Sequence, residues 1–315
     1  MAAPSETTIA FVGTGVMGLS MAGHLIDAGY RLVVFNRTAE KAAPLVARGA
    51  RLVGSAGEAA SAADIVISMV GYPADVEDVY LAPGGIVERA RDGAVLIDMT
   101  TSSPELAARV AKAAAERGIA ALDAPVSGGD VGARNATLTI MVGGDENAFA
   151  TVEPVLAVMG ANVVLQGGPG AGQHTKMANQ VAIAGSMLAT VESLAYATRA
   201  GLDPQRVLLS IGAGSAASWS LANLAPRILS GDFAPGFYVK HFVKDMRIAM
   251  DSAIHMGLDL PGLAAAKRLY EHLESSGGAN LGTQALWLLY ADDAARERAG
   301  VDAMARTTNA GGGAA

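Results

Sequence analysis

The chain has 315 residues, which is enough for two domains that each bury a core of their own. About half of the residues (51%) are hydrophobic and 17% are charged, a composition typical of globular rather than disordered proteins. The net charge of −7 argues against nucleic acid as a partner, because phosphate binding needs a basic surface.

The sequence contains no cysteine, which excludes disulfides, thiolate metal sites and cysteine nucleophiles and is typical of the reducing cytoplasm. Its five histidines are scattered without the spacing of a helical ligand pair, so we expect no metal site. We expect no apolar run long enough to span a membrane, and residues 1–7 lack the features of a signal peptide. We interpret residues 1–7 and the tail 308–315 as disordered arms.

The first half of the chain alternates short β-branched runs with alanine-rich helical stretches. This pattern predicts an α/β Rossmann domain, a mostly parallel doubly wound sheet, over residues 1–167. The predicted strands are 8–12, 31–35, 65–70, 94–99, 120–123, 137–142 and 162–165, with helices such as 17–28, 104–117 and 146–159 between them. The strands near 123 and 142 leave no room for a full crossover helix, so we expect an antiparallel pair at one edge.

The second half, residues 168–307, lacks a convincing strand and shows long Ala/Leu/Met periodicity. We predict an all-helical domain that begins with a long helix over 173–199, ended by Gly201. Further helices are predicted at 204–211, 221–230, 239–256, 264–275 and 284–290. The segments 208–209 and 286–289 are apolar on more than one helix face, which suggests surface to be covered by a second copy.

A GxGxxG pattern follows the first predicted strand and opens a helix, and its residues are Gly13, Thr14, Gly15, Val16, Met17 and Gly18. The first glycine permits a tight turn, the second lets a pyrophosphate approach the backbone, and the third lets helix and strand pack closely. In this strand–turn–helix context the pattern predicts a dinucleotide site. A mere tight turn is the alternative.

The second predicted strand ends in Asn36, Arg37 and Thr38, where an NAD-selective site would carry an acidic residue. Arg37 can pair with a 2′-phosphate and Thr38 can donate to it, so we predict that NADP is preferred and NAD is possible. The alternative is a solvated arginine beside an ordinary helix N-cap. Two later strand ends, near Met69–Val70 and Thr101, should reach the same cleft, although spacing alone favours loop chemistry and helix capping before Pro73 and Pro104.

Two further segments carry chemistry. Ser127, Gly128 and Gly129 offer a hydroxyl and flexible backbone N–H groups that can bind a carboxylate or an oxyanion. Lys176 lies on the long predicted helix and shares a face with Asn179 and Gln180. A lysine near the start of an apolar helix is poorly solvated, which favours a proton-transfer role, whereas most helical lysines are surface residues.

These motifs together resemble the β-hydroxyacid dehydrogenase family. The resemblance rests on GxGxxMG, on Asp-Ala-Pro-Val-Ser-Gly-Gly from Asp123, and on Gly-x-Gly-x-x-x-Lys-x-x-Asn from Gly170, in this order and spacing. It extends from Ile9 to about Tyr290. The family includes 3-hydroxyisobutyrate dehydrogenase, tartronate semialdehyde reductase, succinic and glyoxylic semialdehyde reductases and, more distantly, 6-phosphogluconate dehydrogenase.

The resemblance implies an NAD(P)-dependent enzyme that interconverts a small β- or γ-hydroxy acid and its aldehyde. Lys176 would be the general acid/base, and Ser127, Gly128 and Gly129 would hold the substrate carboxylate. Asn179 would position the substrate, although relatives often carry the amide at the place of Gln180. The cofactor would also be contacted by Val70, Thr101 and Lys244, with Asp245 in support. Family members usually form dimers through the helical domain.

Two alternatives remain. Imine reductases share the fold and the Asn-Arg-Thr motif but generally lack the catalytic lysine, so Lys176 argues against that activity. A dinucleotide-binding module without chemistry is disfavoured by the intact set of Ser127, Lys176 and Asn179.

Overall fold

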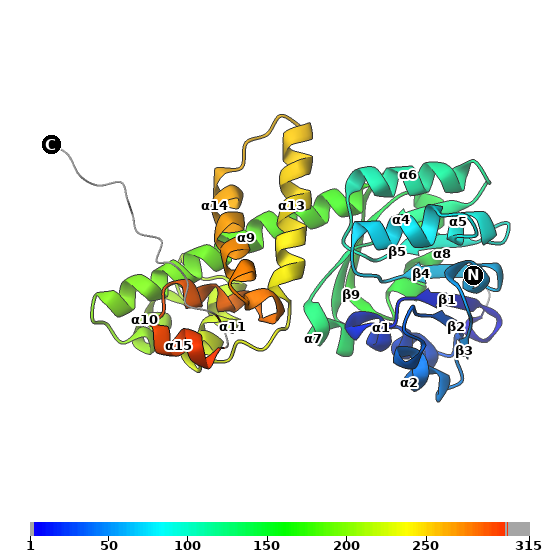
Figure 1. The fold of residues 1–315 in the computed structure, drawn as a ribbon. Coiled ribbons are helices and arrows are strands. Elements are labelled where there is room, and N and C mark those ends of the chain that lie inside the picture. Colours follow the sequence, from blue (N-terminus) through cyan, green and yellow to red (C-terminus); the bar gives the residue numbers. More distant parts are fainter. Residues whose placement is uncertain (1–2, 300, 302–315) are drawn as a thin grey trace. The chain divides into compact units, whose positions relative to one another are not determined.

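The computed structural model describes residues 3–299 and 301, and the chain divides into two compact units, Met1–Ala178 and Asn179–Ala315. The first unit is a sheet with helices on both faces, and the second is helical over its described residues (Figure 1). The predicted fold class, a Rossmann domain followed by a helical region, is confirmed. The division falls inside helix α9 (Ala171–Arg199), whereas the sequence places it between residues 167 and 168.

The sheet has nine strands. Their bounds are β1 (Thr8–Val12), β2 (Arg31–Phe35), β3 (Arg51–Leu52), β4 (Ile65–Ser68), β5 (Val95–Asp98), β6 (Ala120–Asp123), β7 (Val126–Ser127), β8 (Leu138–Gly143) and β9 (Gly160–Gly167). All strands predicted from the sequence are present. The two-residue strands β3 and β7 were not predicted, because a pair of residues is too short for alternation to be detected.

The strand order is β3-β2-β1-β4-β5-β6-β8-β7, with β9 paired to β8. Strands β1 to β6 pair in parallel, and β8 runs antiparallel to both β6 and β7. The expected antiparallel element is therefore confirmed. The connection between β7 and β8 contains only the six-residue helix α7 (Gly129–Arg134).

Both faces of the sheet are buried. Alternate residues of β1 face opposite ways, so that Ile9 and Phe11 join one core cluster while Ala10 and Val12 join the other. The first cluster lies under α1 (Val16–Asp27), α2 (Ala43–Val46) and α8 (Glu146–Leu156). The second lies under α3 (Ala56–Ser61), α4 (Pro73–Leu81), α5 (Ile86–Arg89) and α6 (Pro104–Ala115) (Figure 1). A 3₁₀ helix, η2 (Ala39–Ala42), leads into α2.

The second unit consists of helices. Their bounds are α10 (Pro204–Ile211), α11 (Trp219–Asn223), α12 (Ala225–Leu229), α13 (Val239–His255), α14 (Pro261–Ser275), α15 (Asp293–Arg298) and the 3₁₀ helices η3 (Gly278–Asn280) and η4 (Thr283–Leu289). Its core contains Phe242 and Tyr270, whose ring centroids are 5.0 Å apart. Helix α9 ends as predicted, with Gly201 in the left-handed region at φ +73°.

Two helix predictions in this unit are wrong in detail. The segment 221–230 contains the end of α11 and the whole of α12 rather than one helix, because Pro226 is tolerated in the first turn of α12 but not in the interior of a helix that starts at 221. The segment predicted as an α-helix over 284–290 is the 3₁₀ helix η4. Its side chains Leu286 and Leu288 are fully buried within the unit, so they supply no exposed face for a partner.

The N-terminal arm is ordered where the structure describes it. Pro4–Glu6 form the 3₁₀ helix η1, and Arg31 Nη2 donates to the Glu6 carbonyl at 2.5 Å. The prediction of disorder over residues 1–7 is wrong for this segment, because η1 is bonded to the start of β2. The predicted tail, 308–315, lies outside the described residues.

Helix α9 is long and apolar enough to cross a membrane by length and composition, with a mean hydropathy of 1.3 in its best window. The prediction that no segment reaches this length is wrong in that respect. Within the described part of the chain no other helix meets the same test. This is weak evidence for a membrane span, since the core helix of a soluble protein also meets it.

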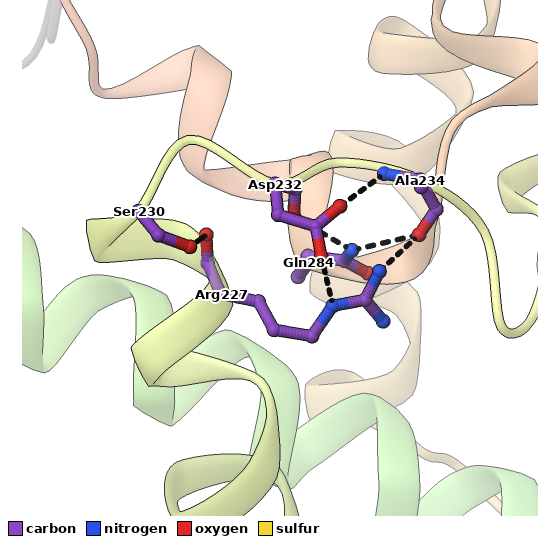
Figure 2. A network of polar contacts seen from close by, with 5 residues as sticks. All are labelled: Arg227, Ser230, Asp232, Ala234 and Gln284. Atoms are coloured by element: carbon purple, nitrogen blue, oxygen red, sulfur yellow. Dashed lines mark hydrogen bonds and ion pairs between the residues drawn. The ribbon is translucent and has the colours of Figure 1, made fainter.

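A polar network fixes the loop between α12 and α13 (Figure 2). Arg227 Nε donates to Asp232 Oδ2 at 2.8 Å, and the hydrogen bond from Arg227 lowers the pKa of Asp232. Gln284 Nε2 donates to the carbonyl oxygens of Asp232 and Ala234 at 3.0 and 3.1 Å. The network ties this loop to η4 and so fixes the approach to α13.

Asp98, at the end of β5, is buried at 6% exposure, and this burial raises its pKa to about 6. Hydrogen bonds from Ser68 Oγ (2.7 Å) and from the Thr100 amide (3.1 Å) act in the opposite direction and favour the carboxylate. Because the pKa of Asp98 in the folded chain lies above the ordinary value of an aspartate, the native state binds this proton more tightly than the unfolded state. The unfolding free energy therefore falls as the pH rises from about 4 to about 6.

We predict that Asp98→Asn removes this pH dependence, because an amide does not titrate in this range. The amide oxygen can still accept both hydrogen bonds. At pH 8 the variant should exceed wild type in stability by up to about 3 kcal/mol, the value of roughly two pKa units. The advantage should shrink when urea unfolding midpoints are compared at pH 4.5. Asp92→Asn, at a side chain that is 98% exposed, is the control. An advantage of equal size at both pH values would contradict the prediction.

Candidate functional site

The glycine-rich turn after β1 requires two of its glycines for packing. Gly13 has φ +97°, and a side chain there would collide with the Met69 carbonyl. A side chain at Gly18 would collide with the Gly13 carbonyl and contact the ring of Phe11. The turn and the start of α1 therefore lie close to the ends of β1 and β4, as the GxGxxG pattern predicts.

Gly15 differs from the other two, because no heavy atom lies within 4 Å of the position its Cβ would occupy. It is the N-cap of α1 and offers no side-chain acceptor to the first-turn N–H groups. Val16 is 61% exposed beside it, whereas Met17 packs on the core. Open space over an uncapped helix N-terminus fits a pyrophosphate group, as a dinucleotide requires.

The Thr14 hydroxyl is a second feature of this turn that suggests a bound ligand. It is buried, and its oxygen has no hydrogen-bond partner among the described residues. Buried hydroxyls normally have a partner, so an orphan at this turn points to a group that binds there.

Asn36 joins the glycine-rich turn to the loop after β2. Its Oδ1 accepts from the Thr14 amide at 2.8 Å, and its Nδ2 donates to the Thr38 carbonyl at 2.8 Å. Asn36 therefore fixes the loop after β2 against the glycine-rich turn, a bridging role that the sequence did not indicate.

Arg37 and Thr38 extend from this bridged loop. The Arg37 side chain is 87% exposed, and its Nη1 lies 3.3 Å from Asp75 Oδ1 in α4. Thr38 is exposed and precedes η2 as its N-cap without a side-chain hydrogen bond. Both side chains are accessible to a ligand at the end of β2.

The loops that follow β4 and β5 are linked to each other by a hydrogen bond. Met69 packs against one core cluster and Val70 against the other. The Val70 amide donates to Thr100 Oγ1 at 3.0 Å, which links the loops after β4 and β5. Thr101 follows in the β5 loop and is half-buried. The side chains of Met69 and Val70 therefore contribute to packing at the ends of these strands.

Lys176 lies beside the loop that contains Ser127. It is 6% exposed, and its Nζ donates to the Val126 carbonyl at 2.8 Å. Gly128 and Gly129 have φ values of +128° and +61°, which ordinary L-residues rarely adopt. The structure thus brings the lysine and the serine–glycine loop together within the first unit.

Asp123 determines where α9 begins. Its two carboxylate oxygens accept from the Gly170 and Gln173 amides at 2.7 and 2.8 Å, so a residue of β6 caps a helix 47 positions later. Burial raises its pKa, and these hydrogen bonds oppose the shift. A side chain at Gly172 would collide with the Met141 and Asp123 carbonyls, which explains the second glycine of the Gly-x-Gly pattern.

Gln173 adds a second anchor. It is fully buried, its Oε1 accepts from the Ser102 amide at 2.9 Å and its Nε2 donates to the Thr100 carbonyl at 2.8 Å. The first turn of α9 is therefore bonded to the loop after β5 as well as to β6. Lys176 stands one turn further along the same helix.

Asn179, Gln180, Lys244 and Asp245 belong to the second unit, where they form a cluster of their own. Gln180 is buried, and its Nε2 donates to Asp245 Oδ2 at 2.6 Å while its Oε1 accepts from Asn179 Nδ2 at 2.8 Å. Lys244 Nζ lies 3.1 Å from Asp245 Oδ1. The amide of Gln180 is thus bonded inside the unit, while Asn179 is half-buried at the helix surface.

Three residues that shape this site are not indicated by the local sequence. Asp123 only begins a motif, Gln173 only belongs to a predicted helix, and Asp75 lies in no motif. A buried acid or amide that bonds a distant backbone amide leaves no periodic signal in the sequence. The described residues contain no group of three or more potential metal ligands.

Comparison with known proteins agrees with this geometry. Residues 8–168 match the family model of the NAD binding domain of 6-phosphogluconate dehydrogenase. Residues 170–290 match the model described as NAD-binding of NADP-dependent 3-hydroxyisobutyrate dehydrogenase.

Individual relatives cover nearly the whole chain. The uncharacterised oxidoreductase YkwC of Bacillus subtilis is 53% identical over 90% of this chain and 99% of its own length. A 3-hydroxyisobutyrate dehydrogenase-like protein of Arabidopsis thaliana is 50% identical over 90% of this chain and 85% of its own. The solved structure of Mycobacterium tuberculosis 3-hydroxyisobutyrate dehydrogenase with L-serine is 33% identical, covers 90% of this chain and 98% of its own, and has a TM-score of 0.84.

Two family models in sequence order, relatives at 50% identity and above, and a glycine turn shaped for a dinucleotide all lead to one assignment. The chain belongs to the β-hydroxyacid dehydrogenase family and is an NAD(P)-dependent oxidoreductase.

Proposed function

We propose that the chain interconverts a small β- or γ-hydroxy acid and its aldehyde or semialdehyde, with Lys176 as the general acid/base. The observation that carries this proposal is the buried Lys176 ammonium bonded to Val126, next to the paired glycines Gly128 and Gly129. The 3-hydroxyisobutyrate dehydrogenase names among the relatives support a carboxylate-bearing substrate. Imine reduction is not favoured, because these relatives are hydroxy-acid enzymes and the lysine is present.

A bound nicotinamide cofactor supplies the hydride that reduces the carbonyl carbon. The residues of the chain handle the proton and the charge. Lys176 holds at Nζ the proton that passes to the substrate oxygen in reduction and takes it back in oxidation. The hydrogen bond to the Val126 carbonyl holds this nitrogen in place beside the serine–glycine loop.

The carboxylate of the substrate would bind at Ser127, Gly128 and Gly129. The hydroxyl and the backbone N–H groups of a positive-φ glycine pair form a cradle for an anion. Asn179, three residues after Lys176 on α9, would position the substrate, and Gln180 would support it through Asp245. Lys244 would contact the cofactor, as the family resemblance implies.

The adenosine end of the cofactor would be bound by Asn36, Arg37 and Thr38, and we propose that NADP is preferred over NAD. The exposed Arg37 guanidinium can pair with a 2′-phosphate, and no residue from 36 to 38 is acidic. Gly13, Thr14, Gly15, Val16, Met17 and Gly18 would surround the pyrophosphate.

We also propose a homodimer formed through the helical unit, in the cytoplasm. Support for the dimer comes from large apolar side chains exposed on α9, α10 and α11, namely Tyr196 at 78%, Leu209 at 80% and Trp219 at 70%. The absence of cysteine is consistent with a reducing compartment.

Lys176→Ala should lower kcat by about 10²- to 10⁴-fold, because general acid catalysis contributes that much. Cofactor affinity, measured by fluorescence titration, should stay within about threefold of wild type, because the change is at the substrate end. Lys112→Ala, at an exposed lysine of α6, is the matched control and should leave kcat unchanged. Turnover of Lys176→Ala within a few-fold of wild type would rule out the proton-transfer role.

Arg37→Ala should raise KM for NADPH about ten- to hundredfold more than KM for NADH, since a charge-assisted contact contributes about 1.5–3 kcal/mol. The measurement is initial-rate kinetics with both cofactors, with Lys41→Ala in η2 as a control of equal charge change. An equal effect on both cofactors would show that Arg37 does not contact the 2′-phosphate.

Light scattering at micromolar concentration should give wild type a mass of twice the 31.8 kDa of one chain. Leu209→Glu should lower this mass towards that of one chain, because it places a charge on the exposed apolar surface. The control is Lys112→Glu on the other unit. A wild-type mass of one chain would be evidence against the dimer.

A further inference from the structure

The guanidinium proposed to recognise NADP already has an acidic partner. Arg37 Nη1 lies 3.3 Å from Asp75 Oδ1, and the two side chains come from different elements, the loop after β2 and the first turn of α4. Asp75 is only 27% exposed, whereas Arg37 is 87% exposed. The carboxylate is thus the more firmly enclosed member of the pair.

The fold holds Asp75 in place. It is the third residue of α4, and its Oδ2 accepts from the Tyr72 amide at 3.0 Å, at the N-cap of that helix. Its other oxygen faces Arg37. One oxygen therefore caps the helix while the second meets the guanidinium, so the carboxylate cannot move away without uncapping α4.

We propose that Asp75 is a specificity-determining residue of the cofactor site, whose carboxylate weakens the preference for NADP over NAD that Arg37 creates. The proposal rests on the proposed role of Arg37. A 2′-phosphate that approaches Arg37 must share the guanidinium with Asp75 and is repelled by its negative charge. NAD carries no phosphate at this position and experiences neither effect.

The expected effect is moderate. Exposed ion pairs are weak and screened by salt, so removal of the Asp75 charge should strengthen NADP⁺ binding by about three- to tenfold at low ionic strength. NAD⁺ binding should change by less than about twofold. The gain for NADP⁺ should shrink in about 0.5 M salt, where the Debye length falls below roughly 5 Å.

The test is calorimetric titration of wild type, Asp75→Asn and Asp75→Ser with NADP⁺ and NAD⁺ in the absence of substrate. Both replacements keep an oxygen acceptor for the Tyr72 amide, so the cap of α4 is retained. Asp78→Asn is the matched control, because it removes the same charge from an exposed position on the same helix. The expected result is tighter NADP⁺ binding by the Asp75 variants alone.

Arg37→Ala and the double variant Arg37→Ala/Asp75→Asn separate the two proposals. If Arg37→Ala leaves NADP⁺ affinity unchanged, the role of Arg37 itself is wrong. If Arg37→Ala weakens NADP⁺ binding but the Asp75 variants do not strengthen it, the inference about Asp75 is overturned and the role of Arg37 stands. An equal gain from Asp78→Asn would also overturn it, since net charge alone would explain the effect.

Discussion

The bond between the Asp123 carboxylate and the first amides of α9 is the constraint on which the candidate site depends. A strand-end carboxylate accepts from Gly170 and Gln173, and the glycines at 170 and 172 let the helix approach closely enough for this to occur. Lys176 follows within one turn, so its position relative to the serine–glycine loop is determined by the cap. A helix attached only through an apolar face could rotate and would place the nitrogen less precisely.

Close backbone packing also determines the shape of the glycine-rich turn after β1. Gly13 and Gly18 are required because backbone carbonyls occupy the space where side chains would be, while Gly15 leaves open space. One motif therefore combines two glycines that packing requires with one that leaves space at the start of α1. The buried carboxylates Asp98 and Asp123 lie in register on neighbouring strands, at the edge where the loops of the site begin.

Much of this architecture could be predicted from the sequence. The central strands β1, β4 and β5 are buried on both faces, and their continuous apolar runs make them recognisable in the sequence. The GxGxxG turn and the buried Lys176 follow from local spacing and from the family resemblance. Pro226 also carried a readable signal, because it divides what the periodicity suggests is a single helix.

Long-range polar bonds could not be predicted. Asp75 meets Arg37 across 38 positions, Gln180 meets Asp245 across 65, and Gln173 meets Thr100 across 73. Nothing in the local sequence distinguishes these residues from ordinary solvated side chains or caps. Their partners are determined by the tertiary fold, so only the folded chain reveals these hydrogen bonds.

The bridge made by Asn36 also bears on how cofactor use can change in evolution. Its amide uses both ends, accepting from the Thr14 amide and donating to the Thr38 carbonyl. An aspartate at position 36 could still accept from the Thr14 amide. It could not donate to the Thr38 carbonyl, and its second carboxylate oxygen would repel that carbonyl oxygen. A lineage moving towards an acidic strand end would first have to turn the Thr38 carbonyl away. The effect of an acidic residue at position 36 therefore depends on the backbone conformation at Thr38. A variant that changes position 36 alone would be less stable than wild type.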